Sequence, residues 1–85
     1  MKIRHHRIPE RATLLKEKEG VTVDCKIPCK IQLWQDVEFD GNPRMWFYCW
    51  KQDWRRIFVK AFTGKNYGEA EKWWTDNVNM IEGGA

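Results

Sequence analysis

The sequence has little of what marks membrane-spanning and exported proteins. Its 85 residues include only three prolines and three cysteines, and no apolar run approaches the roughly 20 residues that a transmembrane helix needs. The basic amino terminus is not followed by the apolar core of a signal peptide. Three cysteines cannot all pair within one chain, so free thiols in a reducing compartment are expected. These absences predict a cytoplasmic protein without membrane contact.

The chain also lacks repeats, low-complexity stretches and linkers, and its length fits one small domain. The net charge of +3 comes from its amino terminus. Residues 1–11 carry four basic residues and one acidic residue (+3), whereas residues 12–85 carry eleven of each. We therefore expect a basic arm over 1–11 and one domain over 12–85. Basic arms of this kind reach nucleic acid, and a solvated, frayed terminus is the alternative.

Period-two alternation predicts an antiparallel sheet in the middle of the chain. The strands are expected at 30–39, 44–51 and 54–62, joined by turns at 40–43 and 52–53. Helical spacing predicts a helix from about Tyr67 to Met80, with an inward stripe of Ala70, Trp74 and Val78 and a cap at Asn66.

Residues 12–29 allow two interpretations. Pro9 could open a short helix through Leu15, or Glu17–Gly20 could turn a hairpin into a strand over Val21–Cys25. The hairpin is favoured by the alternation after Gly20. The predicted fold is α+β: a three- or four-stranded antiparallel β-meander packed on one carboxy-terminal α-helix, with a basic amino-terminal arm.

The two predicted turns decide which side chains share a face of the sheet. With Phe39 opposite Arg44 and Lys51 opposite Trp54, one face is apolar and would seat the helix. That face collects Ile31, Leu33, Val37, Phe39, Trp46, Tyr48, Trp50, Ile57, Val59 and Ala61. The other face gathers aromatic and charged residues and is the candidate interaction surface. In the alternative reading, residues 1–29 fold over this second face and bury it.

The cysteines and histidines give little support for a metal site or a catalytic site. Cys25 and Cys29 are four residues apart and could join His5 and His6 around zinc, but the spacing differs from the usual pairs. Cys49 lies within a strand, with no base on a rigid element nearby. We expect no enzyme activity, no metal and no cofactor.

Aromatic residues and cations on the second face favour a non-enzymatic module that binds nucleic acid or a complex that handles it. Exposed rings stack on bases at roughly 1–3 kcal/mol each, and cations hold phosphates. The expected aromatic contacts are Trp34, Phe47, Trp54 and Phe58, and the expected basic contacts are Lys2, Arg4, Arg7, Arg56 and Lys60.

The carboxy-terminal half carries a resemblance. The stretch Arg56–Phe62 followed by Glu69–Trp73 is similar to the last strand and helix of the arm-binding domains of phage integrases. This resemblance implies a three-stranded sheet, backed by one helix, that lies in the DNA major groove. The basic amino terminus and the acidic stretch Gln35–Asp40 depart from that family's pattern, and no functional residue is carried over.

A protein partner is the alternative. Interfaces are enriched in Trp, Tyr, Phe, Met and Arg, which fits the mixed-charge aromatic face. Small phage-encoded inhibitors and adaptors, anti-CRISPR proteins among them, resemble this chain in size and element content. Burial of the aromatic face against a second copy, as in a homodimer, is a third reading.

Overall fold

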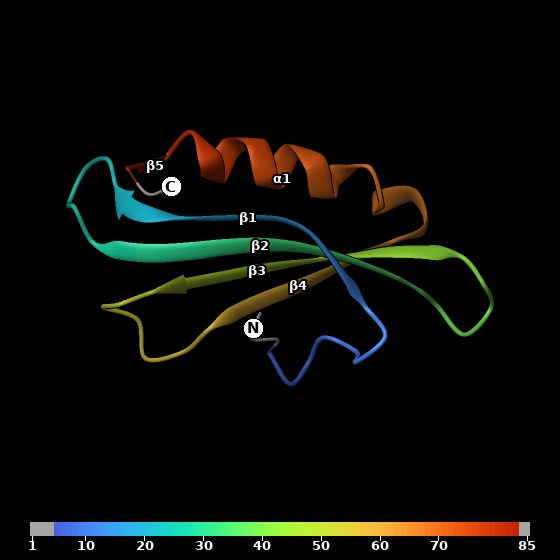
Figure 1. Ribbon diagram of the computed structural model, residues 1–85. Helices are drawn as coiled ribbons and strands as arrows, with labels where there is room; N and C mark the ends of the chain where they lie inside the picture. The colour runs from blue at the N-terminus through green and yellow to red at the C-terminus, as the bar shows by residue number, and fades with distance from the viewer. Residues whose placement is uncertain (1–4, 84–85) are drawn as a thin grey trace.

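Five antiparallel strands form a single sheet with the order β4-β3-β2-β1-β5, and one helix covers one face of it, running roughly along the strands (Figure 1). This computed structural model describes residues 5–83. The elements are β1 (Thr13–Thr22), β2 (Pro28–Val37), β3 (Pro43–Lys51), β4 (Phe58–Thr63), a 3-10 turn (Gly64–Asn66), α1 (Glu69–Val78) and β5 (Ile81–Glu82). The α+β class, the antiparallel sheet and the carboxy-terminal helix are confirmed, and the sheet has five strands rather than three or four.

β1 runs without interruption through the segment for which the sequence predicted a turn. Both the short helix and the turn at Glu17–Gly20 are wrong, because this stretch pairs along β2 from Thr13↔Gln35 to Val21↔Pro28. Its charged side chains find partners across the pair, as where Gln32 Nε2 donates to Glu17 Oε2 at 2.6 Å. The chain reverses just after this strand instead.

The pairing of β2 with β3 differs from the prediction by three residues. Asp36 lies opposite Arg44, so the connecting loop takes residues 38–42, whereas Phe39 was expected opposite Arg44. An odd shift moves a whole strand's side chains to the other face of a sheet. The faces predicted for β3 are therefore exchanged, and the side chains of β3 that face α1 are Met45, Phe47 and Cys49 rather than Trp46, Tyr48 and Trp50.

The face under α1 holds the larger core. Its buried residues come from β2, β3, β4, α1 and β5: Cys29, Ile31, Leu33, Met45, Phe47, Cys49, Phe62, Ala70 and Ile81. The predicted stripe of Ala70, Trp74 and Val78 is confirmed, since all three belong to this cluster or pack on it. The helix is two residues shorter at each end than predicted, and Gly68 stands at its N-cap without a side-chain hydrogen bond, in place of Asn66.

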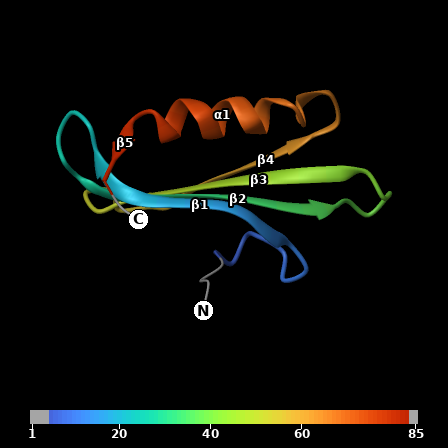
Figure 2. The same cartoon turned by 45° about the horizontal axis from the view of Figure 1, so that its top comes forward.

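The opposite face is covered in part by residues 5–12, which form a third layer below the sheet (Figure 2). Ile8 is fully buried there, in a cluster with Trp34, Tyr48 and Val59. Two backbone hydrogen bonds shape this segment, from Ile8 N to the His5 carbonyl and from the residue 12 amide to the residue 9 carbonyl. The described part of the predicted arm thus packs on the sheet.

A buried carboxylate ties this layer to the strands. Asp36, whose side chain is fully buried, accepts hydrogen bonds from Arg44 Nε at 2.9 Å and Nη2 at 2.6 Å, and from Trp46 Nε1 at 3.0 Å. Arg11 Nε lies 3.9 Å from the same carboxylate, and Arg11 Nη2 donates to the Val37 carbonyl at 2.8 Å. The Arg44 guanidinium beside Asp36 holds the pKa of that carboxyl below its usual value, against the opposing effect of burial.

Candidate functional site

Two of the four predicted aromatic contacts are core residues. Phe47 is 1% exposed and lies under α1, because the register of β3 places it on the helix face. Trp34 is 5% exposed and lies under Ile8, and its Nε1 donates to Gln32 Oε1 at 3.0 Å. Neither ring is open to a partner, so the predicted continuous aromatic sheet face does not form.

The other two predicted aromatic residues lie at the surface, at the end of the sheet where β3 turns into β4. Trp54 is 41% exposed and Phe58 is 38% exposed. Phe58 is stacked on Trp73 of α1, with ring centroids 5.8 Å apart and planes 3° from parallel. The Lys51 ammonium lies 4.8 Å from the Trp54 ring centroid. Both rings are thus partly open to solvent, and a cation lies over Trp54.

Basic residues are concentrated in the same stretch. Residues 51–60 contain Lys51, Arg55, Arg56 and Lys60 against a single acid, Asp53, which gives +4 − 1 = +3. Arg55 and Arg56 are exposed, and Lys60 Nζ lies 5.4 Å from the Trp73 ring centroid. The sequence reasoning identified Arg56 and Lys60 but missed Lys51 and Arg55. The net charge of a ten-residue window reveals all four, because it reaches +3 over residues 51–60. The net charge of residues 12–85 is zero and does not reveal them.

The β3–β4 connection also lines a hollow that is open to solvent. It has a volume of about 580 Å³ and is lined by the consecutive residues 53–58. Its wall therefore contains the Trp54 and Phe58 rings and the Arg55 and Arg56 side chains together. We call residues 51–60, which form the β3–β4 connection and the strand ends beside it, the basic aromatic loop. It brings the flat Trp54 and Phe58 rings together with the long Arg55 and Arg56 side chains.

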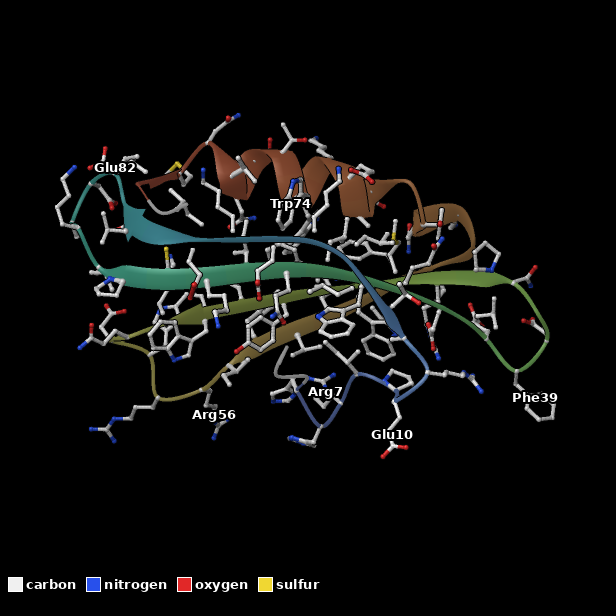
Figure 3. All side chains as sticks on the ribbon, viewed as in Figure 1. Arg7, Glu10, Phe39, Arg56, Trp74 and Glu82 are labelled. Atoms are coloured by element: carbon white, nitrogen blue, oxygen red, sulfur yellow. The ribbon has the colours of Figure 1, made fainter. Side chains whose placement is uncertain are left out.

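The predicted basic contacts of the amino terminus divide into two groups. Lys2 and Arg4 lie outside the described residues. Arg7 is exposed on the segment that covers the sheet, and its backbone amide donates to His5 Nδ1 at 3.2 Å. In Figure 3 the labelled Arg7 and Arg56 both lie on the side of the sheet away from α1. Arg7 and Arg56 thus lie on the side away from the helix, whereas Lys60 lies over Trp73 of α1.

The cysteines have the surroundings of structural thiols. Cys29 and Cys49 are buried on the helix face, and burial raises the pKa of both thiols, that of Cys49 to about 11. At neutral pH they are therefore protonated and weak nucleophiles. Cys25 is exposed in the turn after β1. Within residues 5–83, no group of three or more His, Cys, Asp and Glu side chains is arranged to hold a metal ion.

No family model, curated protein or solved structure matches the chain. Over the described residues, no helix has both the length and the apolar character to cross a membrane.

Proposed function

We propose that this chain is a small, non-enzymatic nucleic-acid-binding module whose main contact surface is the basic aromatic loop. One observation carries the proposal: four cations and two partly exposed aromatic rings, Trp54 and Phe58, lie within the ten consecutive residues that form the β3–β4 connection and the strand ends beside it. Phosphates attract the cations, and rings stack on bases. The basic amino-terminal segment, through Arg7, supplies a second contact.

The charge of the domain is segregated in a way that supports this proposal. Residues 12–85 carry eleven basic and eleven acidic residues, so removing the loop's four and one leaves 7 − 10 = −3 for the rest. An acidic body repels nucleic acid and leaves the loop and the amino terminus as the attractive regions. Arginine suits such a contact, because its guanidinium holds phosphate in a bidentate fashion.

Fluorescence polarisation with a fluorescein-labelled single strand of thymidines, at about 50 mM salt and rising, tests the proposal. With four loop cations engaged, the slope of log K against log salt should be roughly −3, at about −0.7 per phosphate neutralised. The double variant Arg55→Ala/Arg56→Ala should halve that slope. The matched variant Lys65→Ala/Lys72→Ala removes the same charge from exposed positions in the 3-10 turn and in α1, and should keep most of the slope.

Two results would count against nucleic-acid binding. One is the absence of any polarisation change at low salt with thymidine, uridine or duplex probes. The other is equal weakening by the two double variants, because that would reduce the interaction to net charge without a defined surface.

A protein partner is the second candidate, and a different observation favours it. Phe39 is fully exposed at the tip of the β2–β3 loop, between Glu38 and Asp40, with Val37 beside it at 48% exposure. Aromatic anchors of this kind are common hot spots of protein interfaces, and an inhibitor or adaptor binds through such an interface without a catalytic site. Capture of the same partner from a nuclease-treated lysate by the native chain, and its loss with Phe39→Ala, would support this function.

A further inference from the structure

Two further hollows adjoin the one in the basic aromatic loop. On the helix side lies a hollow of about 240 Å³, which shares Trp54 and Phe58 with the loop hollow and adds Trp73 and Asn77 to the lining. On the opposite side of the sheet lies one of about 330 Å³, which shares Ile57 with the loop hollow. The three hollows therefore follow one another around the end of the sheet, and we call them the track.

Each hollow of the track has an aromatic wall. The helix-side hollow has Trp73 and Phe58, the loop hollow has Trp54, and the third has Trp50 and Tyr48. All three exceed the volume of about 150 Å³ that admits a benzene ring in a protein interior. A planar heterocycle therefore has room beside a ring in each.

Cations accompany the track from one end to the other. Lys60 lies over the Trp73 ring at the helix-side end, and Arg55 and Arg56 line the centre. Lys30 lines the third hollow, where its Nζ is 3.5 Å from Glu19. Asp53 and Glu19 are the acids in the linings of the central and third hollows. The cations thus outnumber the acids along the track, as an anionic strand requires.

We propose that the track binds three successive nucleotides of a single-stranded nucleic acid, one base in each hollow, with the phosphates facing the cations. This inference rests on the proposed function and narrows its ligand. Bases in a duplex are paired and stacked, so their faces cannot enter recesses that wrap around the end of a sheet. Unpaired bases can be splayed and stacked on aromatic rings regardless of sequence.

The native chain can be tested with labelled thymidine strands of 3, 6 and 12 nucleotides, a 12-nucleotide uridine strand and a 12-base-pair duplex at matched low salt. Single strands should bind at least tenfold more tightly than the duplex. The 3-nucleotide strand carries two internucleotide phosphates for the four loop cations and should bind more weakly than the 6-nucleotide strand. Length beyond six nucleotides should add only the gain from more binding registers. The DNA and RNA arms show which sugar is preferred.

Single substitutions test whether individual hollows bind a base. Trp50→Ala and Trp54→Ala should each weaken single-strand binding by about 5- to 160-fold, the range for loss of one stacked base. Trp50→Phe and Trp54→Phe should recover most of it, because a smaller ring still stacks. Phe39→Ala removes an exposed aromatic ring at the far end of the molecule and is the matched control (Figure 3). Near-UV circular dichroism checks that each variant keeps its fold.

Distinct results overturn this inference and the proposed function. If the duplex binds as tightly as the single strands, or if the tryptophan variants bind like Phe39→Ala while Arg55→Ala/Arg56→Ala does not bind, nucleic-acid binding stands and the track is refuted. If no nucleic acid binds, both fail together.

Discussion

Replacing Asp36 by asparagine should destabilise the fold by about 2–3 kcal/mol. Removing one partner from a buried ion pair typically costs roughly 3–5 kcal/mol, because the other charge is left unpaired. Here the Arg44 side chain is 22% exposed, so water can solvate its unpaired charge and make the destabilisation smaller. The asparagine oxygen can still accept a hydrogen bond from one of the donors, Arg44 or Trp46. The change is large for a chain of this length, whose whole stability should be about 4–13 kcal/mol.

Urea unfolding followed by tryptophan fluorescence measures this effect, with Asp76→Asn as the control that makes the same charge change on an exposed helix position. Acid adds a second signature. The pKa of Asp36 is lowered in the folded state, so its stabilisation is present above the unfolded value of about 3.9 and is lost as pH falls through the folded value. The gap between native and Asp36→Asn should therefore close below about pH 4. A loss under about 0.5 kcal/mol at pH 7, or a gap that does not change in acid, would refute the reasoning.

Two further predictions concern close packing and thiol access. A Cβ at Gly20 would lie 2.3 Å from a carbonyl oxygen of β5. Gly20→Ala should therefore lower the free energy of unfolding in urea by about 1–3 kcal/mol. Gly68 has open space around it, so Gly68→Ala should be neutral or stabilising by up to about 1 kcal/mol. A destabilised Gly68→Ala with an unaffected Gly20→Ala would contradict the described pairing. With Ellman's reagent, Cys25 should react at once in the folded protein, while Cys29 and Cys49 should react only on unfolding; three equally fast thiols would place the buried pair at the surface.

The sequence predicted element types well because those depend on local chemistry. Alternation marked β2 and β4, and the spacing of Ala70, Trp74 and Val78 marked the helix and its buried side. β1 was harder, because the charged run from Lys16 to Glu19 has the composition of a turn. That run is a strand because side chains on β2 pair with it, and such partners cannot be seen in a local pattern.

The candidate site was only half predictable, and the reason lies in β3. From Met45 to Trp50 every residue is apolar or aromatic, so both faces of that strand suit a core and alternation cannot choose between them. The assumed turn then decided the register, and an error of three residues exchanged the faces. The β3–β4 register moved by two, so β4 changed face together with β3, and Phe58 lies on the helix side, where it stacks on Trp73. Phe58 and Trp54 are still partly exposed, because they lie at the end of the sheet where β3 turns into β4.

The burial of Ile8 also sets how the amino-terminal charge must be tested. This side chain fills the space over Trp34, Tyr48 and Val59, so deleting the first eleven residues would remove a piece of the core together with the cations. Any loss of binding in such a truncation would mix unfolding with lost electrostatics. Charge reversal at Arg7, which is exposed, leaves the Ile8 side chain in its buried position and measures the contribution of charge alone.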